Sequence, residues 1–191
     1  MSSTASRRVM VAAVGCEYRG DDAAGPAVLD RVGELDGVDM LGALGSPLDL
    51  LGAWDGADLA IVVDAVEGAD APGGVCIIDV DMTSVPDVSD RTRSIASSHG
   101  LGVIAALRIA GAMGTAPERV LLVGVSGEDF DGSAGLSPAA SRAVELAAQR
   151  VVELAGGATV LSLDRCAPRG SRRPDRLGPH RTGSPQGDHR L

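Results

Sequence analysis

Two carboxylates and one imidazole in this sequence have the types and positions to hold a divalent metal ion. Asp22 follows a loop that contains glycines, Asp64 ends the apolar run LAIVVD, and His99 stands between a serine and a glycine at the expected start of a helix. His99 is also the only histidine before residue 180. Such a ligand set binds a transition metal and leaves coordination positions open, which a catalytic or sensing site requires.

Each of these residues also has a plain structural interpretation. Asp22 or its neighbour Asp21 can cap the helix that follows, while the other acid points elsewhere. Asp64 can be a cap or turn residue after its strand, although a carboxylate at the end of an apolar run needs a metal or a hydrogen-bond network to offset its burial. His99 can be an incidental residue at a helix start. Their joint position at one edge of a sheet favours a functional site.

The elements that must position these residues alternate between strands and helices, which predicts crossover connections and a mostly parallel sheet. The expected strands are Arg8–Val14, Val38–Leu41, Leu59–Asp64, Val75–Val80 and Arg119–Val125. The expected helices are Ala23–Gly33, Leu48–Trp54, Gly100–Met113 and a last one that begins at Ser137-Pro138 and ends at Gly156-Gly157. We therefore expect an α/β fold, a three-layer α/β/α sandwich around a twisted sheet of about five strands. Because ligands bind beyond the carboxyl ends of parallel strands, the three candidate residues can share one rim.

The length of 191 residues fits a single domain, which we place at residues 1–164. An Arg-, Pro- and Gly-rich tail follows at residues 165–191, and we expect it to be disordered. Hydrophobic residues make up 45% of the chain and aromatic residues only 2%, so the core must be built from aliphatic side chains. The polar stretch Thr83–Ser97 lacks periodicity and predicts a long loop.

Charge and composition exclude several classes of protein. The net charge of −9 argues against nucleic-acid binding by the folded body, whereas the tail holds seven arginines and two aspartates. No apolar run approaches the about 20 residues that cross a bilayer, and no signal peptide precedes the first strand, so we expect a cytoplasmic protein without a membrane segment. The cysteines, Cys16, Cys76 and Cys166, are odd in number and far apart, which fits a reducing compartment without structural zinc.

The motifs of two other enzyme classes are missing. The loop Gly15–Gly25 lacks the G-x-G-x-x-G spacing of dinucleotide sites, and the chain has no lysine for a P-loop, so a nucleotide enzyme is disfavoured. A serine nucleophile elbow of the G-x-S-x-G kind is also absent, since Gly124–Gly127 is only superficially similar.

Three ordered blocks of the chain resemble those of the NiFe-hydrogenase maturation proteases. The blocks are AVGCEYRGDDAAGPAVLDRV, LLGAWDGADLAIVVDAVEGADAPGGV and SSHGLGVIAALRIAGAMGTAPERVLLVGV, and the sequence GLSP follows at Gly135–Pro138. The similarity extends from about Val9 to about Leu154. Three blocks in the same order are more specific than any single short motif.

The resemblance implies an activity and a set of site residues. Proteins of this family are endopeptidases that remove a short C-terminal extension from the hydrogenase large-subunit precursor once nickel has been inserted. By that resemblance Asp22, Asp64 and His99 are the nickel-recognising and catalytic residues. The nickel is then that of the substrate, and no organic cofactor is implied. Water would attack the peptide bond, activated either by the metal as Lewis acid or by a carboxylate as general base.

The first loop departs from the family pattern. The family usually has Gly-x-Gly-Asn where this chain has Ala13-Val14-Gly15-Cys16, and Asp-Asp-Gly where it has Asp21-Asp22-Ala23. Cys16 then lacks the donors and acceptor of an amide, and our preferred interpretation is a small buried cysteine. Two rivals stay open: a thiol protease with a Cys16–His99 dyad, and a nickel-dependent docking or chaperone protein that has lost proteolysis.

Overall fold

The computed structural model describes residues 7–67, 72–82, 100–131 and 135–157. Its centre is a five-stranded sheet with the order β2-β1-β3-β5-β4. β4 runs antiparallel to β5 at one edge, and the other neighbours are parallel. The strands are β1 Val9–Val14, β2 Val38–Leu44, β3 Leu59–Glu67, β4 Val75–Asp81 and β5 Arg119–Gly127. The mostly parallel, five-stranded sheet predicted from the sequence is confirmed.

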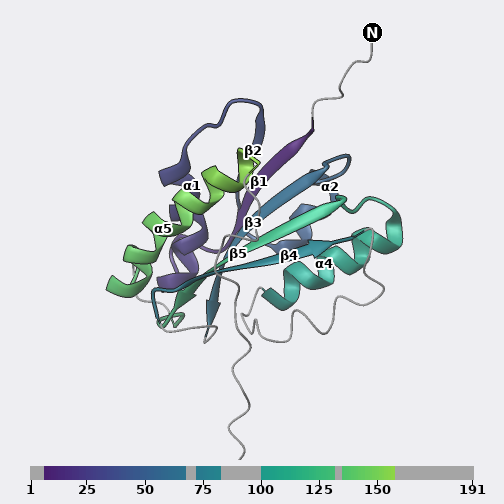
Figure 1. Cartoon of the computed structure of the whole chain (residues 1–191). Coiled ribbons are helices and arrows are strands. Elements are labelled where there is room, and N and C mark those ends of the chain that lie inside the picture. Colours follow the sequence, from purple (N-terminus) through teal and green to yellow (C-terminus); the bar gives the residue numbers. More distant parts are fainter. Residues whose placement is uncertain (1–6, 68–71, 83–99, 132–134, 158–191) are drawn as a thin grey trace, which may run out of the picture.

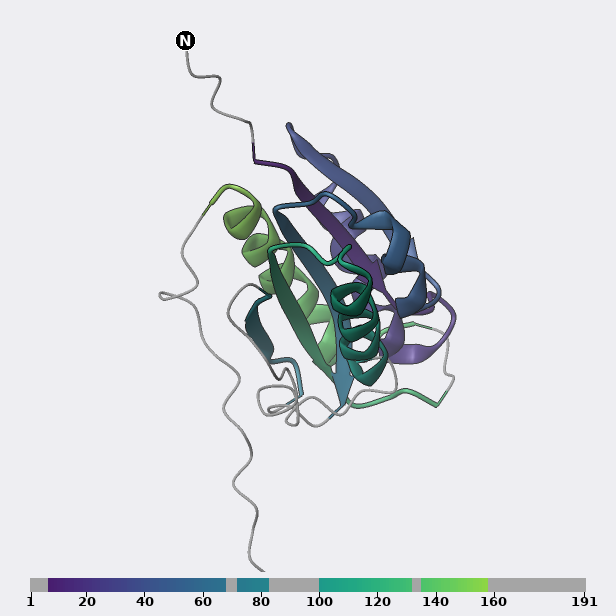
Figure 2. The ribbon, with the colours of Figure 1, turned by 90° about the vertical axis from the view of Figure 1, so that its right-hand side faces the viewer.

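Helices cover both faces of this sheet, which confirms the three-layer α/β/α sandwich. Figures 1 and 2 show one helical layer formed by α1 (Ala24–Val32) and α5 (Pro138–Ala155), and a second formed by α2 (Leu50–Ala53) and α4 (Gly100–Met113). Two short 3-10 helices, η1 and η2, lie at Gly20–Ala23 and Pro47–Asp49. None of the helices in the described part of the chain is long and apolar enough to cross a membrane.

Each face of the sheet has its own aliphatic core, because successive residues of a strand point to opposite faces. Ile61, Val63 and Val123 pack under α1 and α5, whereas Val62 and Leu122 pack under α2 and α4. β3 is buried along its whole length except at Glu67, as expected for a strand covered on both sides. The cores hold almost no aromatic side chains, in agreement with the composition.

The predicted start of the last helix is also confirmed. Ser137 is the N-cap of α5, and its Oγ accepts a hydrogen bond of 3.1 Å from the backbone N–H of Ala140. Pro138 occupies the first helical position, where its missing N–H has no consequence. Three predictions concern residues outside the described ranges: the loop Thr83–Ser97, His99 and the tail 165–191.

Candidate active site

Asp22 lies in η1, directly after the loop that follows β1. Its side chain is only 2% exposed, and its Oδ2 accepts a hydrogen bond of 3.0 Å from the backbone N–H of Cys16. Gly15 makes this closure possible, because its φ is +145° and a Cβ at this position would run into the backbone carbonyl of Asp22. The loop thus folds back on itself and holds the carboxylate in place.

Asp64 lies inside β3 and is 6% exposed. It stands opposite Gly124 of β5 in the parallel register, and the strand continues to Glu67. The neighbouring residues Val62 and Val66 belong to the core beneath α2 and α4, so Asp64 points to that face. The alternative that Asp64 is a cap or turn residue after its strand is therefore wrong.

The beginning of α1 brings these two acids toward each other. A Cβ on Gly25 would lie 2.7 Å from the carbonyl oxygen of Val14 and 3.1 Å from that of Val63, so the helix sits almost directly on the end of β1 and on the part of β3 next to Asp64. η1 also contacts β3. The turn that carries Asp22 is consequently packed against the strand that carries Asp64.

The first turn of α4 lies at the same edge of the sheet. A Cβ on Gly102 would lie 2.7 Å from Cγ of Pro47, which belongs to η2 and follows the carboxyl end of β2. His99 directly precedes this helix in the sequence and is outside the described residues. Within the described ranges, no three His, Cys, Asp or Glu side chains form a group that could hold a metal ion.

Asp21 links the first loop to the segment between β5 and α5, a role that was not predicted from the sequence. Neither it nor Asp22 caps α1, whose N-cap Ala23 receives no side-chain hydrogen bond, so the capping interpretation is wrong. Instead the Asp21 carboxylate is fully buried and accepts backbone N–H hydrogen bonds from Glu128, Asp129 and Ser137, with lengths of 2.8, 3.1 and 2.6 Å. The first loop is thereby tied to the segment between β5 and α5.

The surroundings of Asp21 favour its charged form. Burial by itself raises the pKa of this carboxyl. The hydrogen bonds from the backbone N–H groups of Glu128, Ser137 and Asp129 together lower it by more, so that the pKa lies below its ordinary value. Gly127 provides the space, since a Cβ there would lie 2.7 Å from Cβ of Asp21. We call the Asp21 carboxylate with its three backbone N–H donors the Asp21 clamp. No pattern in the sequence predicts this clamp, because the donors are more than a hundred residues away from Asp21.

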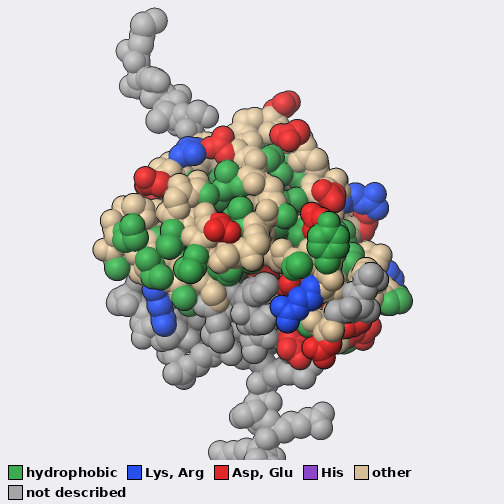
Figure 3. Space-filling model, turned by 180° about the vertical axis from the view of Figure 1, so that it is seen from behind, with side chains coloured by type: hydrophobic (Ala, Val, Ile, Leu, Met, Phe, Trp, Pro, Cys, Tyr) green, Lys and Arg blue, Asp and Glu red, His purple; other side chains and the backbone are tan. Residues whose placement is uncertain are grey.

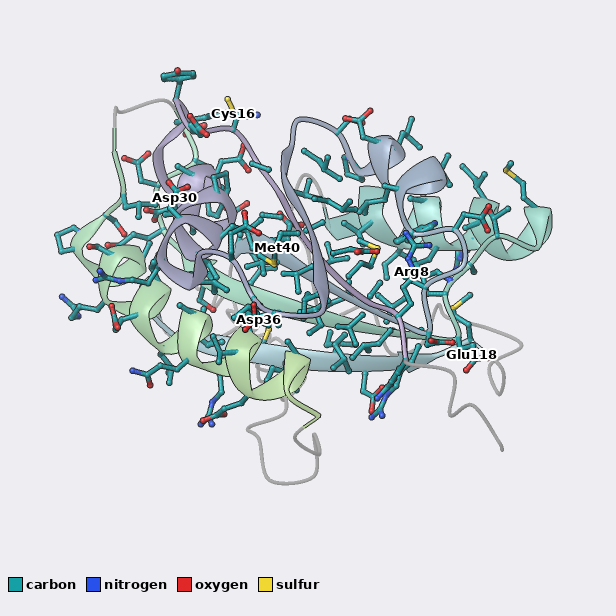
Figure 4. All side chains as sticks on the ribbon, turned by 90° about the horizontal axis from the view of Figure 1, so that it is seen from above. Arg8, Cys16, Asp30, Asp36, Met40 and Glu118 are labelled. Atoms are coloured by element: carbon teal, nitrogen blue, oxygen red, sulfur yellow. The ribbon has the colours of Figure 1, made fainter. Side chains whose placement is uncertain are left out.

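Cys16 is exposed, so the prediction of a small buried cysteine is wrong. Figure 4 shows it on the loop at the end of β1 that lies far from Arg8, with its side chain pointing away from the sheet. What Cys16 contributes to Asp22 is its backbone N–H, which any residue except proline supplies. The second described cysteine, Cys76, is buried and pairs with Gly124 in the register of β4 and β5.

Acidic side chains dominate the exposed positions around this edge. Those at or just beyond the ends of β1, β3 and β5 are Glu17, Glu67, Glu128 and Asp131, and Arg19 is the exposed basic residue of the first loop. The rear face of the molecule carries further separate acidic side chains and few arginines (Figure 3). A surface of this sign attracts cationic segments and repels phosphate groups.

Comparisons with known proteins identify the family and agree with the fold. The family model described as hydrogenase maturation protease (HycI) matches residues 29–154, a range that begins after Asp21 and Asp22. The chain is similar to the solved structure of the hydrogenase maturating endopeptidase HybD from E. coli, with 25% sequence identity, a TM-score of 0.64, and coverage of 78% of this chain and 94% of that one.

Two further solved structures are similar over most of their length. A hydrogenase 2 maturation peptidase from a Thaumarchaeota archaeon has 28% identity and a TM-score of 0.58, with 78% of this chain and 98% of that chain covered. An endopeptidase from Escherichia coli, solved in solution, has 26% identity and a TM-score of 0.64, with 85% and 98% covered. No curated protein matches the chain significantly.

Proposed function

The chain belongs to the hydrogenase maturation protease family, and from this we propose that it removes the C-terminal extension of a NiFe-hydrogenase large-subunit precursor after nickel insertion. The coarser statement, that it is a processing endopeptidase, follows from the family and from its similarity to the maturation endopeptidases of known structure. The substrate, the role of nickel and the site residues are the parts that we propose.

One observation carries the proposal. Two buried carboxylates, Asp22 and Asp64, stand on elements that contact each other at the carboxyl edge of the sheet. Ligands of parallel α/β proteins bind at this edge. Buried carboxylates are costly unless they serve hydrogen bonds, a cation or chemistry, so their presence in an otherwise aliphatic interior supports a functional site.

In this proposal Asp22, Asp64 and His99 recognise the nickel that the precursor carries. Carboxylate and imidazole ligands suit such an ion and leave positions open for groups of the substrate. Recognition of the metal docks only loaded precursors, and this explains specificity without a deep side-chain pocket. Water then attacks the scissile carbonyl, and either a carboxylate takes its proton or the metal polarises it.

The test is cleavage of nickel-loaded precursor by purified wild-type protein and by Asp22→Ala, Asp64→Ala and His99→Ala variants. The mass of the large subunit reports the loss of the extension. We expect the wild type to shorten the precursor and all three variants to fail. Full activity in all three variants would refute the proposed site while leaving the family assignment untouched.

A thiol mechanism is a second candidate, and the exposure of Cys16 beside Asp22 favours it. A Cys16 thiolate would attack the carbonyl, with His99 as its base. The docking or chaperone alternative predicts that the protein binds the loaded precursor and leaves its mass unchanged. The cytoplasmic location stays a prediction from the sequence.

A further inference from the structure

The buried polar side chains of the described residues gather at one place. They are Asp21, Asp22, Asp64 and Ser126. Asp21 serves as the clamp, and the other two acids form the proposed site. Ser126 is the member of this set that no role described so far explains.

Ser126 is 1% exposed, and its Oγ has no hydrogen-bond partner in the part of the chain that the structure describes. Its backbone is fully engaged, since its N–H donates to the carbonyl of Gly74 and its carbonyl accepts from the N–H of Gly73, both at 2.9 Å. A hydroxyl that is buried without a partner destabilises the folded state, so an alanine at this position would give a more stable protein. Such unsatisfied groups need an explanation, and function is a common one.

The register places Ser126 on the same face of the sheet as Asp64. Asp64 pairs with Gly124, and Ser126 follows two residues later on β5, opposite Val66. Its position is therefore displaced from that of Asp64 by about 4.8 Å across the strands and about 6.6 Å along them, toward the carboxyl edge. These two offsets combine to about 8 Å, and an extended peptide whose scissile carbonyl lies at Asp64 covers this distance within three residues.

Outside the proposed site, two more buried polar atoms have no hydrogen-bond partner among the described residues, and their positions differ. They are Nε1 of Trp54 and Oγ1 of Thr115. Trp54 follows α2 and precedes β3, and Thr115 precedes β5, so both lie toward the amino ends of these strands. An unsatisfied atom alone does not indicate a site, but Thr115 supplies a matched control for Ser126.

We propose that Ser126 is a substrate-contacting residue: its hydroxyl forms a hydrogen bond with the main chain of the precursor segment that is held for cleavage beside Asp64. This inference rests on the proposed function. The hydroxyl both donates and accepts, so it suits either a peptide carbonyl or a peptide N–H. The partner that the free protein lacks is then supplied by the substrate.

The experiment compares Ser126→Ala with Thr115→Val, each of which removes one buried hydroxyl without a partner. Both variants should unfold in urea at the same denaturant concentration as the wild type or at a higher one. Only Ser126→Ala should lower kcat/KM for the precursor, by about threefold to tenfold, the value of one neutral hydrogen bond. Values of kcat/KM within twofold of the wild type, or a lower unfolding midpoint for Ser126→Ala, would overturn the proposal.

A binding measurement separates this inference from the proposed function. The dissociation constant of the nickel-loaded precursor, measured by calorimetry, should rise for Ser126→Ala by a similar factor and stay unchanged for Thr115→Val. If the wild type binds the precursor without cutting it, the protease function is wrong and the dissociation constants still decide the role of Ser126. If the wild type does not bind the precursor, both proposals are wrong.

Discussion

The backbone N–H of Cys16 donates a hydrogen bond of 3.0 Å to Oδ2 of Asp22. This bond ties the carboxylate to its own loop, and it uses no atom of the cysteine side chain. The thiol itself is exposed. The loop therefore orients Asp22 through a backbone N–H, which is present whether this position holds Cys16 or the asparagine that is usual in the family.

From this relationship we predict that Cys16→Ala retains cleavage within about threefold of the wild type, because alanine keeps the backbone N–H that Asp22 accepts. Cys16→Pro, which removes the donor, should lose most activity. The rate of precursor shortening measures both. Loss of activity in Cys16→Ala would instead support the thiol mechanism.

Asp64→Asn should abolish catalysis without unfolding the protein. The amide has the shape of the carboxylate but neither its charge nor its basicity, so we expect kcat to fall by about 10²- to 10⁴-fold. The urea unfolding midpoint should stay the same or rise, since a buried charge is removed. A variant that cuts at the wild-type rate would contradict the role of Asp64.

Asp21→Ala should destabilise the fold by about 3 kcal/mol, because three backbone N–H groups lose the buried charged acceptor that they share. Chemical denaturation measures this loss. A matched control is Asp131→Ala, since this carboxylate is exposed and should matter by less than about 0.5 kcal/mol. Equal stabilities of the two variants would contradict the clamp.

The same clamp predicts a dependence of stability on pH. The pKa of Asp21 is lower in the folded chain than in the unfolded one, where it is about 3.9. Its stabilisation is thus fully present above about pH 5, well above the unfolded pKa, and is lost as the pH falls through the folded value. The difference in unfolding free energy between the wild type and Asp21→Asn should narrow as the pH falls from about 5 to about 3. A constant difference over this range would contradict the lowered pKa.

Gly15→Ala should destabilise the protein by about 2 kcal/mol and weaken cleavage, because the new Cβ meets the backbone of Asp22 at a positive φ. Gly52→Ala is the control. Gly52 lies in α2 with open space around it, so alanine there should be neutral or stabilise by about 0.5–1 kcal/mol. Thermal unfolding and the cleavage rate measured together show whether the loop geometry matters for Asp22.

The sequence predicted the strands well because their burial on both faces leaves long aliphatic runs. β1 begins within one residue of its predicted start, and the sandwich follows from the alternation of elements. β3 and β5 nevertheless extend beyond their predicted ends at Asp64 and Val125. A polar residue looked like the end of β3, yet pairing with β5 continues through Asp64 to Glu67. Tertiary pairing here overrides the local pattern.

The candidate site was predicted only in part. The positions of Asp22 and Asp64 at the carboxyl edge follow from the order of elements, whereas the clamp of Asp21 depends on contacts with distant residues. The prediction of a buried Cys16 failed because a loop residue has no periodic neighbours from which its burial can be deduced. The sequence presented Ser126 only within Gly124–Gly127, which is not a nucleophile elbow. Its hydroxyl, buried without a partner among the described residues, becomes visible only in the structure.

The dependence of cleavage on nickel tests the central claim most directly. Wild-type protein is incubated with the nickel-loaded precursor and, separately, with the same precursor prepared without nickel, and the mass of each large subunit is measured. We predict that only the loaded precursor loses its C-terminal extension. An unchanged mass in both samples, or equal shortening of both, would contradict a nickel-gated processing endopeptidase.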